Sequence, residues 1–197
     1  MFTGIVEAVG CVVAVEEREG TRRVRFDAPT LGPELGLGDS VAVDGACLTV
    51  TDADTSGFAV DVIGTTLGRT IAGRYLLESA VNLERALAFG GRIDGHLVQG
   101  HVDGLGALVR SEKTGDFWMM DFRLPSEVAA LTVPRGSVAL NGVSLTVADL
   151  LGDDVCRIGI IPHTHAHTNL GRLAPGDPVN VEGDLIGKYV GRVLAGR

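Results

Sequence analysis

Short runs of apolar and β-branched residues, bounded by Gly, Asp and Ser, recur along most of the chain. Gly4–Val15 and Arg22–Phe26 are rich in Val with partial alternation, and the polar turn between them predicts a β-hairpin. The first half holds further runs of this kind at Val41–Val43, Leu48–Thr51, Phe58–Val62 and Val81–Glu84. About six short strands in each half predict an all-β chain of small antiparallel barrels or sandwiches.

Helical patterns are confined to short segments and to the C-terminal end. Leu185–Leu194 places its apolar residues at i, i+1, i+4, i+5, i+8 and i+9, which predicts a helix with one apolar face. Shorter helices are expected at Thr65–Thr70, Ser126–Leu131 and His163–Leu170. The C-terminal helix has no counterpart after the first half. Its apolar face is expected either to pack on its own barrel or to mediate oligomerisation.

The chain contains an internal duplication. Residues 40–50 and 137–147 are identical at seven of eleven positions, and other matches keep the same order at offsets of 96 to 98. Asp44-Gly45 and Asn141-Gly142 occupy equivalent places between strands, where Asx-Gly favours a type I′ turn. Repeats of this size predict two homologous domains, at residues 1–96 and 97–184, followed by an oligomerisation helix at 185–197.

Composition narrows the class of protein. The net charge is −8, with 17 basic and 25 acidic residues, which argues against a nucleic-acid partner. No apolar run reaches the roughly 18 residues that cross a bilayer, and the first residues lack the pattern of a secretory signal. The three cysteines are widely spaced and suggest neither a disulfide framework nor a zinc motif. A soluble, cytoplasmic protein is expected.

Five motifs in order carry a family resemblance: Met-Phe-Thr-Gly-Ile-Val at 1–6, Asp-Gly-Ala-Cys-Leu-Thr-Val at 44–50, Gly-His-Leu-Val-Gln-Gly-His-Val-Asp-Gly at 95–104, Asn-Gly-Val-Ser-Leu-Thr-Val at 141–147 and Ile-Pro-His-Thr at 161–164. Together they resemble riboflavin synthase, a family whose subunit carries two lumazine-binding repeats. The resemblance runs from Met1 to the terminal helix.

This resemblance implies a fold, a reaction and an assembly. Each half would be a six-stranded Greek-key barrel that binds one 6,7-dimethyl-8-ribityllumazine. Four-carbon transfer between two lumazines would give riboflavin and 5-amino-6-ribitylamino-pyrimidinedione, without a metal or organic cofactor. The active site would lie between the N-terminal barrel of one subunit and the C-terminal barrel of a neighbour in a homotrimer. Association with lumazine synthase is a further expectation.

Positions where the repeats differ are candidates for distinct chemical roles. The family reaction needs a nucleophile at C7 of one lumazine and removal of a proton from the C7 methyl of the other. Cys47 is expected to add directly or to position a hydroxide, or else it is a small buried apolar residue. His101 and Ser144 are expected to form a proton-transfer pair. Thr146 is a further catalytic candidate, and as the counterpart of Thr49 it is expected to hydrogen-bond the pteridine or the ribityl chain. The resemblance places Asp184 near a functional carboxylate, although it also suits a helix N-cap.

The resemblance also implies two sets of substrate-binding residues. The first pocket would be lined by Gly4, Ile5, Val6, Ser40, Leu48, Thr49, Asp61, Val62, Ile63, Gly64, Thr65 and Thr66. The second would be lined by Gly100, Val102, Leu145, Gly159, Ile160, Ile161, Pro162, His163 and Thr164. Phe2 and Arg135 are expected to reach a ligand, Arg135 being equally compatible with a solvated surface position. Thr65 and Gly68 stand where the family usually has Glu and Arg, so the first pocket has lost a carboxylate.

Three other interpretations remain open. His163, His165 and His167 alternate, and on a strand they would face one way and could hold Zn or Ni. The chain could instead be a non-catalytic lumazine- or flavin-binding protein of the same fold. A thiol hydrolase built from Cys47 and His101 is the third alternative, although it does not account for the duplication.

Overall fold

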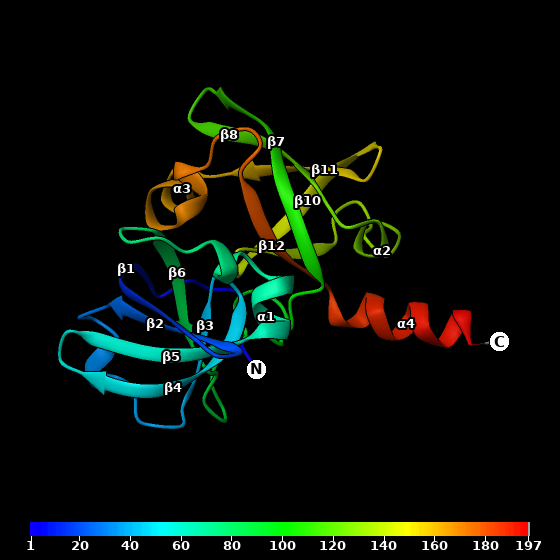
Figure 1. The fold of residues 1–197 in the computed structure, drawn as a ribbon. Helices are drawn as coiled ribbons and strands as arrows, with labels where there is room; N and C mark the ends of the chain where they lie inside the picture. The colour runs from blue at the N-terminus through cyan, green and yellow to red at the C-terminus, as the bar shows by residue number, and fades with distance from the viewer. Residues whose placement is uncertain (197) are drawn as a thin grey trace.

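The computed structural model describes residues 1–196 and shows two closed antiparallel barrels followed by a helix (Figure 1). The first barrel is formed by β1 (Ala8–Arg18), β2 (Thr21–Asp27), β3 (Ser40–Val43), β4 (Ala46–Asp54), β5 (Gly57–Ile63) and β6 (Ala80–Arg85). Its strand order is β1-β2-β5-β4-β3-β6. Strands β2 and β5 are therefore neighbours in the sheet, although β3 and β4 lie between them in the sequence. This is a Greek-key connection.

The second barrel repeats this topology. It is formed by β7 (Gly104–Thr114), β8 (Phe117–Arg123), β9 (Ser137–Leu140), β10 (Val143–Gly152), β11 (Val155–Ile160) and β12 (Pro178–Gly183). Its order, β10-β11-β8-β7-β12-β9, is the same cycle read from another strand. The all-β fold with two homologous six-stranded barrels, expected from the duplication, is therefore confirmed.

Each barrel encloses its own apolar core. Phe26 and Phe58 are fully buried in the first, with ring centroids 5.1 Å apart. Phe122 and Ile158 are fully buried in the second. Alternate residues of each strand point inward, as the period of two in the sequence requires. Replacing a buried phenylalanine of this kind by alanine costs about 3–5 kcal/mol, so the two cores hold the outward-facing side chains in place.

Short helices connect the strands, and three of them begin close to the expected positions. They are η1 (Gly32–Glu34), α1 (Gly64–Arg69), η2 (Ile71–Arg74), α2 (Ser126–Ala129), α3 (Pro162–His167) and η3 (Asn169–Arg172). The helix expected over His163–Leu170 is interrupted at Thr168, whose φ of −135° and ψ of 164° are extended. The Thr168 hydroxyl accepts a hydrogen bond from Leu170 N and so caps the next turn. Within residues 1–196, no helix is long and apolar enough to span a membrane.

The seam between the barrels is closed by the two segments that precede them. Phe2 and Val98 form an isolated antiparallel bridge, and both side chains are buried between the barrels. Gly4 O accepts a hydrogen bond from Ser144 N at 2.8 Å, and Gly100 O accepts one from Cys47 N at 2.8 Å. Each leading segment therefore crosses to the other barrel. The strand expected over Gly4–Val15 begins only at Ala8, because the residues before it serve this crossing.

The two Asx-Gly turns meet at the centre of the seam. Asp44 and Gly45 have φ of 46° and 76°, and Asn141 and Gly142 have φ of 45° and 76°, as a type I′ turn requires. A Cβ added to Gly45 would lie 2.7 Å from Gly142 N, and one added to Gly142 would lie 2.7 Å from Gly45 N. The turns thus touch backbone to backbone on a pseudo-two-fold axis.

A buried polar network surrounds these turns. Asn82 N donates to Asp44 Oδ1 and Asn180 N donates to Asn141 Oδ1, both at 2.8 Å. These two hydrogen bonds are equivalent in the two repeats. Asp44, unlike Asn141, also accepts a hydrogen bond from the Tyr75 hydroxyl, at 2.8 Å. Burial raises the pKa of the Asp44 carboxyl to about 7, despite its hydrogen-bond donors.

The C-terminal helix α4 (Leu185–Ala195) extends away from both barrels (Figure 1). Its base is held on the second barrel by an ion pair between Lys188 and Asp103 at 2.7 Å. Gly191 lies against Leu131, where an added Cβ would come within 2.6 Å of a methyl group. The apolar face stays exposed, at Ile186, Tyr189, Val190, Val193 and Leu194. Residue 197, within the expected span of the helix, lies outside the described residues.

Candidate functional site

A pocket of 370 Å³ lies on the first barrel at the seam. It is lined by Ala46, Cys47, Thr65, Thr66, Arg69, Thr70, Gly100, His101 and Val102. The thiol of Cys47 is half-buried on β4, and α1 supplies Thr65 and Arg69 one helical turn apart. The hydrogen bond from Cys47 N to Gly100 O brings His101 to the same pocket. The arrangement places a thiol and an imidazole in one cavity.

The equivalent place on the second barrel is built around Ser144. Its backbone N–H donates to Gly4 O, as Cys47 N–H does to Gly100 O. The Ser144 hydroxyl lies 2.7 Å from Nδ1 of His96. The other ring nitrogen, Nε2, is buried without a hydrogen-bond partner among the described residues. Burial lowers the pKa of His96, although the charge of Asp184 opposes this effect. A neutral imidazole paired with a hydroxyl is suited to accept a proton.

Two buried glutamates fix the leading segments at these places. Glu84 accepts hydrogen bonds from Thr3 N at 2.6 Å and from Gly4 N at 3.0 Å. Glu182 accepts from Gln99 N at 2.7 Å and from Gly100 N at 2.9 Å. Burial raises the pKa of both carboxyls, because desolvation outweighs their hydrogen bonds. Each glutamate belongs to the last strand of one barrel and holds the segment that contacts the other.

This crossing corrects the expected grouping of residues. Gly4 contacts Ser144 of the second barrel, and Val6 packs against the second core, so neither lines the first pocket. Gly100 and Val102 line the first pocket instead of the second. The duplication identifies equivalent segments, but it does not say which barrel each one docks on.

Within one chain His101 and Ser144 lie at different barrels, so their expected pair stays a prediction for the contact between two subunits. Ser144 bonds to His96, and His101 stands with Cys47 in the first pocket. His96 belongs to the same Gly-His…Gly-His motif, so the signal for it was present in the sequence. Its role was missed because the short segment between the two histidines passes from the second barrel to the first, so the two side chains reach different barrels.

Other expected contacts are changed by burial. Phe2 is fully buried in the seam, where it packs behind Cys47 and does not line the pocket. Inside the barrels lie the side chains of Leu48, Val62, Leu145 and Ile160. These positions can present only backbone groups to a ligand. Ile63 and Ile161, which directly precede α1 and α3, have exposed apolar side chains.

The shared hydroxyl positions form matched pairs on the outer faces. Ser40 is paired with Thr49 in the register of β3 and β4, and Ser137 with Thr146 in that of β9 and β10. The same outer face of the first barrel carries Asp61, which lies 3.5 Å from Arg18 and 3.6 Å from Arg23.

Two further expected site residues lie outside the pocket lining described above. Arg135 is exposed in a turn with φ of 65° and lines neither place. Asp184 accepts from Ile186 N at 2.9 Å and caps α4, which confirms the expected N-cap. Its charge also acts on His96, and its role as a functional carboxylate stays a prediction. The remaining members of the second set, Gly159, Pro162 and Thr164, lie on the last residues of β11 or on α3, equivalent to the α1 side of the first pocket.

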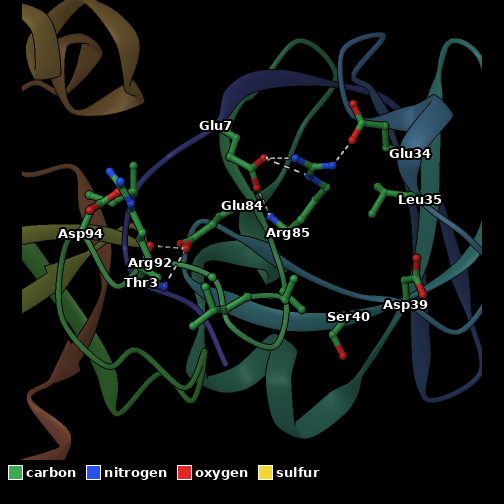
Figure 2. Close-up of a pocket in the computed structure, with 15 residues that line it drawn as sticks. Thr3, Glu7, Glu34, Leu35, Asp39, Ser40, Glu84, Arg85, Arg92 and Asp94 are labelled. Carbon is green, nitrogen blue, oxygen red and sulfur yellow. Dashed lines mark hydrogen bonds and ion pairs between the residues drawn. The ribbon is translucent and has the colours of Figure 1, made fainter.

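A larger groove of 590 Å³ lies on the first barrel and is lined by residues of β3 and β6 and of the connector that follows β6 (Figure 2). Ser40 and Ile5 border it. Figure 2 shows Arg85 of β6 bridging Glu7 and Glu34 across one side. Five carboxylates and two arginines line the groove, so it is mainly acidic. The groove lies at Ser40, whose equivalent in the second repeat is Ser137, so it does not correspond to the Ser144 site.

The three clustered histidines do not form a three-ligand metal site. They lie on α3, a helix, so His165 faces away from His163 and His167. In the part of the chain that the structure describes, no group of three or more His, Cys, Asp or Glu side chains could hold a metal ion.

The lumazine-binding domain model matches the chain twice, at residues 3–86 and 99–184. The riboflavin synthase of Mycobacterium bovis is 41% identical over 197 residues, which cover 98% of this chain and 98% of that protein. The riboflavin synthase of Actinobacillus pleuropneumoniae is 39% identical over 194 residues, covering 98% and 90%. The chain belongs to the riboflavin synthase family. The two matched ranges cover the two barrels and begin inside the leading segments.

Solved structures share the fold of this riboflavin synthase family member. LumP complexed with 6,7-dimethyl-8-(1'-D-ribityl) lumazine superimposes with a TM-score of 0.84 at 23% identity, covering 93% of this chain and 99% of that one. LumP complexed with riboflavin gives 0.86 at 24% identity, with the same coverage. At these identities the likeness supports the shared two-barrel fold.

Proposed function

We propose that this chain is a riboflavin synthase that dismutates two molecules of 6,7-dimethyl-8-ribityllumazine. Four-carbon transfer gives riboflavin and 5-amino-6-ribitylamino-pyrimidinedione. The names of the full-length relatives support this reaction. The observation that carries it is a pair of equivalent places built on one frame, with Cys47 at one and Ser144 at the other. A reaction between two copies of one ligand needs two similar binding places with different chemical groups.

The proposed roles follow from the local environments. Cys47, or a hydroxide that it positions, adds at C7 of the lumazine in the first pocket, where His101 stands beside it. The His96–Ser144 pair takes a proton from the C7 methyl of the lumazine at the second place. The lowered pKa of His96 keeps it in the basic form near neutral pH. Holding both ligands in register replaces a bimolecular encounter and lowers the barrier by up to about 7–11 kcal/mol.

The assembly that we propose is a homotrimer in which the two kinds of place face one another across subunits. The exposed apolar face of α4 supports association, because Val190 is 53% and Val193 63% exposed while the base of the helix is fixed. Residues 1–96 and 97–184 would be the two lumazine-binding units, and the terminal helix the oligomerisation element. Association with lumazine synthase is part of the same proposal, and co-sedimentation of the two purified proteins tests it.

The proposed compartment is the cytoplasm. Cys11, Cys47 and Cys156 are all free. Free thiols persist in a reducing compartment. Fractionation of cells, followed by detection of the chain in each fraction, tests this compartment.

Incubation of the purified chain with lumazine alone tests the reaction. We expect riboflavin to accumulate, one molecule for every two lumazines consumed, with the pyrimidinedione as co-product. The alternative is a non-catalytic lumazine- or flavin-binding protein of the same fold; the solved LumP structures hold lumazine or riboflavin. Tight binding of lumazine with no riboflavin after hours would support that alternative and contradict the enzyme.

A further inference from the structure

The first pocket contains a positive charge that no carboxylate balances. Arg69 lies in the last turn of α1, and its side chain lines the pocket. Other arginines are neutralised by acids, as Arg22 is by Glu17 and Arg157 by Asp121. Among residues 1–196, Arg69 forms no ion pair, and none of the residues that line the pocket is Asp or Glu. In a chain with a net charge of −8, such a cavity is suited to an anion.

Other cavities that contain arginines are balanced by acids. The groove of Figure 2 contains Arg92, but five carboxylates line it as well. A cavity of 450 Å³ at the two Asx-Gly turns contains Arg74 and Arg172 together with Glu78 and Asp177. An anion would meet like charges in both of these cavities. The first pocket is therefore the better candidate for binding an anionic group.

The first pocket also offers hydroxyl groups and an open side. Thr65 and Thr66 line it, and their hydroxyls make no hydrogen bond within the described residues. Cys47 is half-buried, whereas Arg69 is exposed. A ligand whose ring reacts at Cys47 therefore extends its side chain toward solvent, on the side where Arg69 lies. Free hydroxyls match a polyol chain, and the guanidinium matches an anion at the end of that chain.

We propose that the first pocket also binds a ribityl compound that ends in a phosphate group, with Arg69 bound to the phosphate. This rests on the proposed function, because the rest of the ligand occupies the lumazine place. A phosphate monoester carries nearly two negative charges at neutral pH. A guanidinium binds phosphate through two parallel N–H···O bonds. Such a compound competes with lumazine for the pocket and slows the formation of riboflavin.

The second place lacks this feature. The position equivalent to Arg69 is His167. Its Nδ1 lies 2.8 Å from His163 O, and its ring stacks on that of His163 with centroids 4.2 Å apart. The Asp184 carboxylate acts on His96 at the second place and would repel a phosphate. The preference for a phosphorylated ligand is therefore confined to one place in each chain.

Flavin fluorescence titration with riboflavin and with riboflavin 5′-phosphate tests the proposal. The two ligands differ only in the phosphate group. The wild-type chain should bind the phosphate ester at least about fivefold more tightly than riboflavin. Arg69→Gln should lose this preference and keep its affinity for riboflavin. Arg74→Gln is the matched control, because it removes the same charge from an exposed arginine of another cavity and should keep the preference.

Phosphorus NMR of riboflavin 5′-phosphate provides a second readout. The phosphate signal should shift on binding to the wild-type chain and to Arg74→Gln, and much less on binding to Arg69→Gln. Equal affinities for the two flavins in the wild type, or a preference that survives Arg69→Gln, would overturn the inference and leave the proposed reaction standing. An equal loss of the preference in Arg74→Gln would overturn it too, since net charge and not contact would then be responsible. If neither flavin binds, the proposed function falls together with the inference.

Discussion

At the scale of single residues, the two equivalent places differ in what supports the reactive group. Cys47 shares an open pocket with His101, whereas Ser144 is bonded to a desolvated His96. Desolvation lowers the pKa of a histidine, because it disfavours the charged ring. At neutral pH the second place therefore presents His96 in the unprotonated form that a general base requires.

Removing either member of the His96–Ser144 pair should slow riboflavin formation. We expect His96→Ala and Ser144→Ala each to lower kcat by about 10²-fold or more, the usual contribution of a positioned general base. The double variant should be little worse than either single one, since the two groups act as a unit. Stopped-flow measurement of riboflavin absorbance gives kcat for each variant.

The control for this pair is Ser111→Ala, on an exposed part of β7. It should leave kcat unchanged. Full activity in His96→Ala would show that the imidazole is not the base. Losses that multiply in the double variant would show that the two side chains act independently.

At the scale of elements, the turns that meet in the seam are tightly constrained. Gly142 and Gly20 have nearly the same φ, 76° and 74°, but a Cβ at Gly20 would meet nothing within 4 Å. Gly20→Ala therefore costs only the strain of a left-handed residue, about 1–2 kcal/mol. Gly142→Ala also forces the new Cβ against the backbone of Gly45, so it should destabilise the chain substantially more.

Urea unfolding of the two variants measures this difference. Both substitutions change the unfolded chain in the same way, so that contribution cancels in the comparison. Equal losses of unfolding free energy would mean that the two turns do not touch in solution.

The terminal helix supports a second prediction at this scale. Val193 is 63% exposed on the apolar face of α4. Val193→Asp should shift the protein from trimer to monomer, because a charge cannot be buried there without a partner. Arg192→Asp introduces the same side chain at an exposed neighbouring position and should leave the assembly intact. Sedimentation equilibrium reports the mass of each variant, and a trimeric Val193→Asp would exclude α4 as the contact.

At the scale of the whole molecule, sequence patterns predict the parts better than their assembly. The strands, the Asx-Gly turns and the terminal helix follow from alternation, turn chemistry and an apolar face. The docking of Gly4 on Ser144 and of Gly100 on Cys47 cannot be predicted from the sequence. Because the two barrels are repeats, each leading segment could dock equally well on its own barrel or on the other one. His96 was missed for the same reason, since its role depends on which barrel its segment reaches.

The seam also predicts how stability depends on pH. Burial raises the pKa of the Asp44 carboxyl from 3.8 to about 7. The folded chain therefore holds this proton more tightly than the unfolded chain, and the associated stability is present below about pH 4 and lost as the pH rises toward 7. The full loss is at most about 4 kcal/mol.

Asp44→Asn should abolish this part of the pH dependence. Asparagine already occupies the equivalent position, Asn141, with nearly the same φ, so the variant should fold. Urea unfolding between about pH 4 and pH 7 compares the slopes of the two proteins. The raised pKa values of Glu84 and Glu182 act in the same direction in both, so only the difference is informative. Parallel slopes would show that Asp44 keeps an ordinary pKa.

The meeting of Asp44 and Asn141 on the pseudo-two-fold axis has a consequence for the origin of the chain. Separate identical subunits joined about a true dyad must carry the same side chain at both positions. Two acids there would repel, and two amides would leave the Tyr75 phenol without its carboxylate acceptor. Covalent fusion of an ancestral dimer removes that constraint. Each half is then free to diverge alone, so a thiol at one place and a hydroxyl at the other become possible within a single gene product.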